Sequence, residues 1–239
     1  SSYSNGGNTF NGTTTFRNNA SNTASFRLGV QTGDQYNGNI SFITSTGYIQ
    51  PAFAGTSEFK GNVNISSSMV VFNAGSGKML CTGTNNQTFS TSGSLTYLVT
   101  KFGVNKSSGT VTLNAPITID SLLELTNGNI ITSSSNLLTL KATATLSGGS
   151  SMSFVNGPLK KIGSAAFLYP VGKVNEYNPI SLSTGNNVTD SYLVEYFNQG
   201  QSLGNNKDTT IKEINSKMYW YCSRLSGTSI PSISLFWNE

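Results

Sequence analysis

Tyr36-Asn37-Gly38-Asn39-Ile40-Ser41-Phe42 is one copy of a pattern that occurs three times between residues 9 and 72. The pattern is an aromatic residue, any residue, Gly, three further residues and an apolar residue. The other copies run from Phe10 to Phe16 and from Phe59 to Ile65, so the leading aromatics are 26 and 23 residues apart. A repeat of this length is too short for a domain. It suits one coil of a solenoid, which buries its apolar face by stacking on a copy of itself.

Composition supports an all-β chain. Only 10% of the residues are charged, whereas 10% are aromatic and Val, Ile and Thr are plentiful. Disordered chains lack aromatic and β-branched residues, and short apolar strands between polar turns are typical of all-β proteins. Apolar and polar residues alternate in Asn62-Val63-Asn64-Ile65, which places one face of the strand inward. A hairpin-built sandwich or barrel remains an alternative, but the wide, regular spacing favours stacked coils, with Phe89 opening a fourth.

The strand pattern continues beyond the repeats. A corner is expected near Asp120–Ser121, because Leu122–Leu123 breaks the alternation there. Asn127–Gly128 is a strong turn signal. Alternating apolar residues from Leu138 to Leu146 predict a single inward row.

The composition changes after Gly157–Pro158, where most of the prolines and both tryptophans are found and the expected strands become longer. We therefore predict a right-handed parallel β-helix over residues 1–157. A β-sandwich-like module, truncated at its C-terminal end, is predicted over residues 158–239. The chain starts on Ser1 and stops within an apparent strand, which indicates a piece of a longer protein.

The distribution of charges, apolar segments and cysteines argues against nucleic-acid binding, a transmembrane helix and a disulfide-rich scaffold. The net charge of +4 is scattered, and Lys160–Lys161 is the only adjacent basic pair, whereas nucleic-acid binders concentrate basic residues on one face. No segment is long enough to be a transmembrane helix. Cys81 and Cys222 lie far apart, so we expect two buried free thiols, with a disulfide between modules as the alternative.

Several stretches resemble recurrent segments of very large secreted and cell-surface repeat proteins of the Bacteroidetes group. These stretches are Val104 to Lys106 with Gly109 to Val111, Ser147 to Lys161, Phe167 to Lys173, Tyr177 to Ile180, and Met218 to Tyr221 followed by Arg224. The resemblance covers roughly residues 100 to 237, and Cys222 departs from it. It implies an adhesin-like or filamentous extracellular protein exported by the type IX secretion system.

The same group of bacteria attaches O-glycans to Ser or Thr after Asp when an apolar residue or Thr follows. Asp120-Ser121-Leu122 and Asp208-Thr209-Thr210 fit this rule. The resemblance therefore implies Ser121 and Thr209 as possible O-glycosylation sites, the first at the expected corner and the second in a polar loop.

The sequence contains few residues in arrangements that are typical of a catalytic site. The chain has no histidine, which removes the commonest general base and most transition-metal sites. Asp120 and Glu124 would stand about 13 Å apart on a straight strand, beyond the roughly 5 to 9.5 Å of paired glycosidase carboxylates. Asp34 and Glu58 could approach each other on adjacent coils, where a structural calcium ion is conceivable.

Aromatic side chains could bind sugars if they are exposed. We expect Phe10, Tyr36 and Phe59 in the core, because aromatics at matching repeat positions usually form an internal stack. The candidates for stacking on sugar rings are Tyr36, Tyr48, Tyr97, Tyr177, Tyr192, Trp220 and Trp237.

The sequence therefore predicts a non-catalytic structural and adhesive segment of a giant extracellular protein, a rigid stalk of stacked coils. Its expected partners are neighbouring modules of the same chain, surface polysaccharide or secretion machinery, without nucleic acid and without cofactors. Two alternatives stay open: a polysaccharide-processing β-helix whose active residues lie outside this stretch, and a glycan-binding accessory module.

Overall fold

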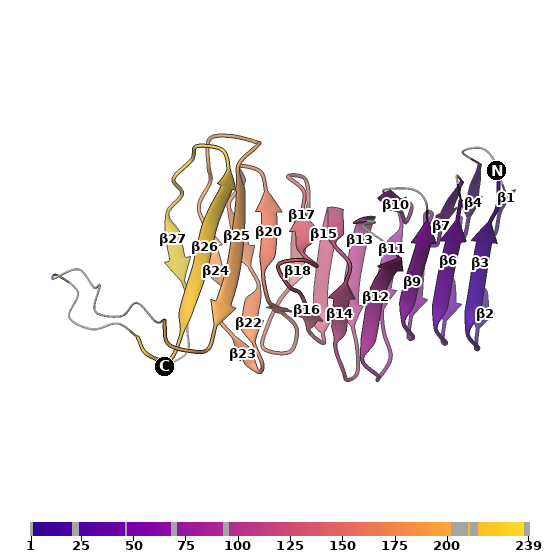
Figure 1. Ribbon diagram of the computed structural model, residues 1–239, viewed down its shortest axis with the longest axis horizontal. Helices are drawn as coiled ribbons and strands as arrows, with labels where there is room; N and C mark the ends of the chain where they lie inside the picture. Colours follow the sequence, from indigo (N-terminus) through magenta and orange to yellow (C-terminus); the bar gives the residue numbers. More distant parts are fainter. Residues whose placement is uncertain are drawn as a thin grey trace.

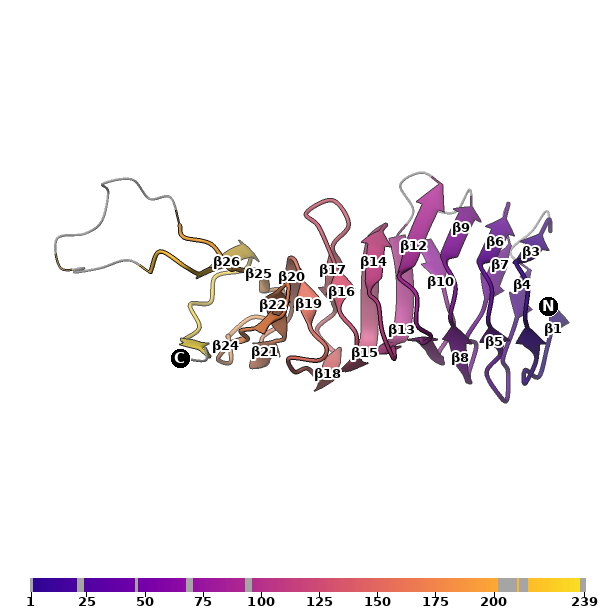
Figure 2. The same ribbon diagram turned by 90° about the horizontal axis from the view of Figure 1, so that it is seen from below.

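The computed structural model describes residues 2–20, 24–45, 47–67, 71–92, 96–201, 210 and 215–236. The chain forms an elongated rod, with the N-terminus at one end and the last strands at the other (Figure 1, Figure 2). The described residues contain strands and no helix, and the strands wind into a parallel β-solenoid of about six turns. The predicted all-β parallel β-helix is therefore confirmed.

Each coil contributes strands to three faces of the rod. The strands of the first face are β2 (Thr9–Phe10), β5 (Gln35–Tyr36), β8 (Thr56–Phe59), β11 (Lys78–Cys81), the second halves of β13 (Thr96–Asn105) and β15 (Ile117–Asn127), and β18 (Thr145–Gly148). The second face consists of β3 (Thr14–Asn18), β6 (Ile40–Thr44), β9 (Val63–Ser67), β12 (Gln87–Ser92), β14 (Val111–Asn114), β16 (Ile130–Ile131), β19 (Val155–Asn156) and β22 (Val171–Lys173). The third face consists of β1 (Ser2–Tyr3), β4 (Ser25–Arg27), β7 (Tyr48–Gln50), β10 (Val71–Asn73), the first halves of β13 and β15, β17 (Leu138–Leu140) and β20 (Leu159–Ile162).

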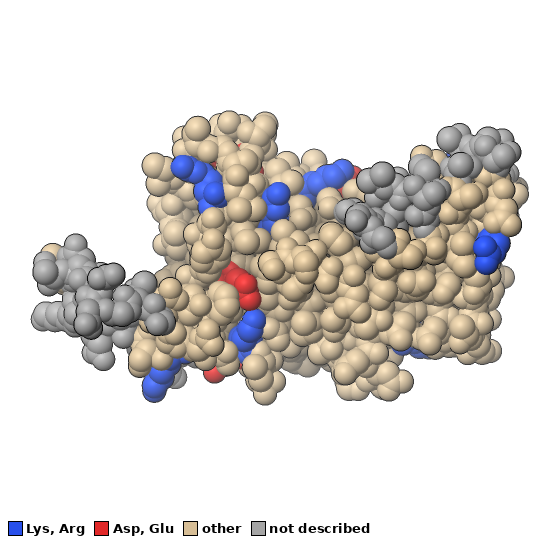
Figure 3. Space-filling view, in the orientation of Figure 1, with Lys and Arg blue, Asp and Glu red and all other residues tan. Residues whose placement is uncertain are grey.

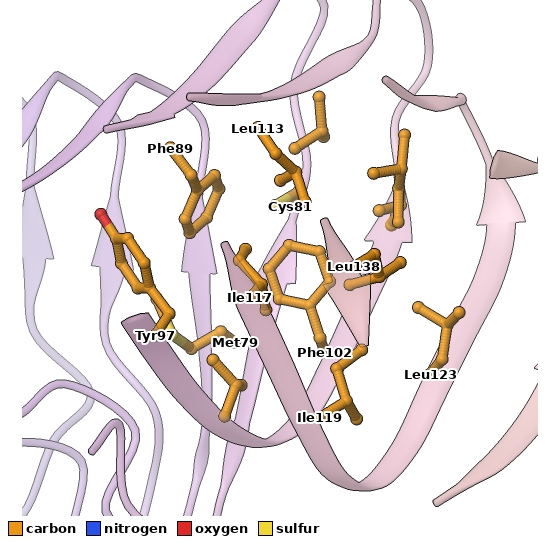
Figure 4. Close-up of a cluster of buried hydrophobic side chains, with 14 of the residues drawn as sticks. Met79, Cys81, Phe89, Tyr97, Phe102, Leu113, Ile117, Ile119, Leu123 and Leu138 are labelled. Carbon is orange, nitrogen blue, oxygen red and sulfur yellow. The ribbon is translucent and has the colours of Figure 1, made fainter. Parts of the chain in front are cut away.

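The repeated aromatics stack inside the rod in register. Phe10 pairs with Tyr36 and Tyr36 with Phe59, with ring centroids 5.3 and 4.8 Å apart. Tyr36 and Phe59 are buried, and Phe10, on the first coil, packs against the same core. The predicted internal aromatic stack is confirmed, and apolar side chains continue it along the rod (Figure 4).

The fourth coil begins earlier than the sequence predicted. Cys81 pairs with Phe59 on one side and with Val104 on the other, so it occupies the aromatic position of the repeat. Phe89 lies on the next face, in register with Val63 and Leu113. The prediction that Phe89 opens this coil was wrong, because the stack needs a buried apolar group and a cysteine satisfies that need without an aromatic ring.

The repeated glycine allows the coils to approach closely. A Cβ atom on Gly61 would lie 2.4 Å from the carbonyl oxygen of Gly38, and one on Gly38 would lie 2.5 Å from that of Gly12. No side chain fits at this distance. Glycine is therefore required at this repeat position by the backbone of the adjacent coil and not by the turn alone.

The expected corner at Asp120–Ser121 is confirmed. Residues 117–119 of β15 pair with β17, whereas residues 122–125 pair with β18, so the strand turns from one face to the next between them. The single inward row predicted from Leu138 to Leu146 was wrong. Ala144 donates its backbone N–H to the carbonyl of Lys141, and this turn divides the row into two strands and exposes Ala142.

The rod ends in antiparallel strands. Beyond residue 157 the parallel ladders run on, since β20 pairs with β17 and β22 with β19. The chain then reverses: β25 (Ser191–Phe197) pairs with β20 and β26 (Tyr219–Ser226) with β25, extending the large sheet. A second layer contains β21 (Phe167–Tyr169), β24 (Ile180–Leu182) and β27 (Ile233–Leu235), and β23 (Glu176–Tyr177) forms a hairpin with β22.

Candidate functional site

A polar hollow of about 540 Å³ lies at the antiparallel end of the rod, beside the β22–β23 hairpin. Serines, asparagines, a carboxylate, an amine and two tyrosines line it. The lining residues are Gly149, Ser150, Ser151, Asn175, Glu176, Tyr177, Asn178, Tyr196, Lys217 and Met218. The volume lies within the roughly 300–1,000 Å³ of small-molecule sites, so this hollow is the candidate site.

One buried phenol positions the carboxylate of the hollow. Tyr196 is fully buried, and its hydroxyl donates a 2.6 Å hydrogen bond to Oε2 of Glu176. Burial, reinforced by this carboxylate, raises the pKa of Tyr196 far above its ordinary value. The phenol therefore stays protonated and acts as a fixed donor, which holds Glu176 in one orientation.

The hairpin that presents Glu176 contains a strained residue. Val174 has a φ of 58° and is 60% exposed. A β-branched residue in this left-handed region costs on the order of 1 to 3 kcal/mol. Tyr177, which follows Glu176 in the hairpin, is held by packing, with its ring centroid 6.1 Å from that of Phe154.

An apolar groove of about 390 Å³ lies next to the polar hollow. It is lined by Ile180, Gln201, Asn215, Met218, Tyr219, Trp220, Cys222, Ile233 and Leu235. Met218 lines both the groove and the polar hollow. The indole N–H of Trp220 donates to the carbonyl of Asn178 at 2.9 Å. The groove thus opens between β26 and β27, the last strands of the two antiparallel layers.

The carboxylates considered for catalysis are engaged elsewhere. Asp120 pairs with Lys141 at 2.8 Å, and Glu124 pairs with Lys78 at 3.2 Å. Both ion pairs join side chains on the outside of the coils, and neither carboxylate lines the candidate hollow.

The acids considered for calcium have different surroundings. Asp34 is fully buried, and its Oδ1 accepts hydrogen bonds from the backbone and side-chain nitrogens of Asn8 at 2.9 and 2.8 Å. Glu58 meets it through the backbone, donating its N–H to the carbonyl of Asp34. Within the described ranges, no three His, Cys, Asp or Glu side chains form a group that could hold a metal ion.

The aromatic candidates divide into core and surface residues. Tyr36, Tyr97 and Tyr192 are buried, so they cannot stack on a sugar. Tyr177 lines the polar hollow, Trp220 lines the apolar groove, and Tyr48 is half-buried on β7. Trp237 lies outside the described residues.

Of the two predicted glycosylation positions, Ser121 lies within the described residues. Ser121 is half-buried at the corner of β15, and its carbonyl accepts the hydroxyl of Thr145 at 3.2 Å. Thr209 lies outside the described residues. O-glycosylation at either position stays a prediction.

Two buried lysines were not anticipated. Lys106 donates to the side-chain oxygen of Gln87 at 2.6 Å and to the carbonyl of Thr82, and burial lowers its pKa. Lys161 donates to three carbonyls, those of Lys141, Ala142 and Ile162, and burial lowers its pKa to about 8. Because backbone carbonyls or an amide satisfy both amines, they join neighbouring coils and have a structural role.

A ladder of asparagines was also missed. Asn39 Oδ1 accepts the backbone N–H of Asn62, Asn62 Oδ1 accepts that of Thr88, and Asn129 Oδ1 accepts that of Phe154. These contacts connect successive coils at the same corner. The recurrent Gly-Asn pairs at 38–39, 61–62 and 128–129 could have revealed the ladder.

The two cysteines are free, as the sequence predicted, with Cys81 buried and Cys222 half-buried. Charged side chains are few and scattered on the face seen in Figure 3. Over the part of the chain that the structure describes, no helix is long and apolar enough to cross a membrane. In comparisons with known proteins, no family model matches the chain, and neither the curated proteins nor the solved structures contain a match.

Proposed function

We propose that this chain is a non-catalytic structural segment of an extracellular surface protein, in which the coils form a stiff stalk. The observation that carries the proposal is one internal column of side chains that stays aligned from coil to coil. Five successive pairings connect Phe10, Tyr36, Phe59, Cys81, Val104 and Leu125 in one internal column. Each coil adds about 4.8 Å, so six turns extend the chain by roughly 29 Å.

The interior explains why such a stalk would be stiff. Backbone hydrogen bonds join each coil to the next, and most of the enclosed side chains are apolar and buried. Bending the rod would open these ladders and expose the packed column, which resists deformation because protein interiors are close-packed. The antiparallel end would join the stalk to a neighbouring module of the same chain.

The residues of the candidate hollow support a binding role more than a catalytic one. Glu176 is the only carboxylate among its described lining residues, whereas glycoside hydrolysis commonly uses two. The polar residues of the hollow suit an adhesive contact with surface polysaccharide. The low charge of the chain suits the same role.

The stiffness of the stalk is tested by distance measurement. Spin labels on cysteines introduced at the exposed Thr15 and Ser147, with Cys222→Ala to remove the accessible native thiol, should give one narrow distance distribution in pulsed EPR. A broad distribution would refute the stalk. Turnover of any polysaccharide by the chain would refute the non-catalytic assignment, and an antibody against the chain that labels cells only after permeabilisation would refute the surface location.

A further inference from the structure

We infer that the polar hollow beside the β22–β23 hairpin binds a neutral saccharide, with Glu176 as the hydroxyl acceptor and Tyr177 as the aromatic contact. The inference does not rest on the stalk function, because the hollow would bind a sugar whether or not the coils bear load. It deepens the adhesive contact proposed above, on which it rests, by naming the residues that would bind the sugar.

The carboxylate of Glu176 is held in position before any ligand binds. Oε2 of Glu176 is held by the buried Tyr196 hydroxyl, and the side chain makes no ion pair with a described residue. Among the described residues no hydrogen bond to Oε1 is found either, so this oxygen can accept from a ligand in a side chain whose orientation is already fixed. A charged acceptor that needs no reordering on binding is well suited to sugar hydroxyls, since charge-assisted hydrogen bonds are stronger than neutral ones.

The surrounding groups complete a surface suited to a sugar. Lys217 lines the same hollow without pairing with Glu176, so a donor and an acceptor are both available to hydroxyl groups. Asn175, in the hairpin turn, adds an amide that can donate and accept. Tyr177 adds a ring that packing against Phe154 keeps in place, and an aromatic face can cover the C–H groups of a pyranose.

Other ligand classes fit this hollow less well. A calcium ion takes six to eight oxygen ligands, usually including several carboxylates, and only one described carboxylate lines the hollow. A phosphate group would meet the negative charge of Glu176. An apolar ligand would leave that carboxylate desolvated and unpaired, which is costly.

The test uses the whole chain and four defined disaccharides: maltose, cellobiose, lactose and N,N′-diacetylchitobiose. Saturation-transfer difference NMR should detect transfer to at least one of them, and titration of that sugar gives its dissociation constant. Glu176→Gln preserves an acceptor for Tyr196 but removes the charge, and it should weaken binding at least about tenfold. Asn175→Ala, in the exposed turn, should weaken it less.

Glu58→Gln is the matched control, because it removes the same charge from β8, on a distant coil, and should leave binding unchanged. Circular dichroism melts check that each variant is folded. The inference is overturned if none of the four sugars shows transfer, or if Glu176→Gln binds as tightly as the unaltered chain. Neither result affects the distance distribution that tests the stalk, so the two proposals fail separately.

Discussion

The coil stack and the antiparallel end use the same all-β composition differently. In the stack, most strands after the first coil pair with a neighbouring coil on each edge, and the internal column from Tyr36 to Leu125 is buried. At the antiparallel end, strands β26 and β27 each have one neighbour among the described strands, and large apolar side chains reach solvent. They include Tyr221, Leu225, Ile230, Ile233, Leu235 and Phe236.

This difference shows where function can reside in such a molecule. A periodic stack repeats one set of contacts from coil to coil. Where the chain reverses direction, residues of different strands converge, as Glu176 and Tyr196 do, and both hollows described above are found there. Rigid scaffolds commonly carry binding residues on such irregular segments.

The two thiols provide the largest expected contrast between these regions. Cys222 borders the apolar groove and should react with iodoacetamide in the native protein. Cys81 lies in the internal column, where burial raises its pKa to about 12, and should react only on unfolding. Peptide mass mapping after labelling, with and without denaturant, measures both. Native labelling of Cys81 at the rate of Cys222 would mean that the column opens readily.

Loss of an aromatic ring should cost more in the stack than at the end. Phe59→Ala leaves a cavity in the column and should destabilise the chain by roughly 3–5 kcal/mol. That corresponds to a fall in melting temperature of roughly 6–20 °C for a chain of this size. Trp220→Ala removes a half-buried ring and should cost about half as much. Circular dichroism melts measure the loss of stability in both variants. Equal losses would contradict the expected difference between the stack and the antiparallel end.

The repeated glycine allows a matched test within the stack. Gly38→Ala places a Cβ against the backbone of Gly12 and should cost roughly 1–3 kcal/mol. Gly12→Ala occupies the same repeat position on the first coil, where nothing lies within 4 Å, and should have little effect. Thermal melts of the two variants should therefore differ. Similar melting temperatures would show that the coils separate easily at this corner.

The smallest expected effect is a pH dependence at Lys161, where the stack meets the antiparallel strands. Burial lowers its pKa from 10.5 to about 8, so between these values the unfolded chain binds more protons than the folded one. The stability contribution of this residue should therefore rise with pH over that window. The melting temperature of the unaltered chain minus that of Lys161→Met should increase from pH 8 to pH 10. A constant difference would show that the lysine titrates normally.

The sequence by itself determined the coil. The spacing of Phe10, Tyr36 and Phe59 and the alternation of apolar and polar residues are local properties, and they were enough to predict a parallel stack with aromatics inside. The break at Leu122–Leu123 likewise located a corner, because the period of two cannot continue through a bend.

Only the tertiary structure decided which residues meet across coils. Cys81 pairs with Phe59 at an aromatic position of the repeat, Lys106 binds Gln87, and Glu176 binds Tyr196. No local sequence pattern marks any of these three pairs. Such contacts join residues about 20 positions apart, so they depend on the length and path of every intervening loop. For the same reason, the residues of the candidate hollow appear in the sequence as ordinary turn and strand residues, and only the folded chain brings them together.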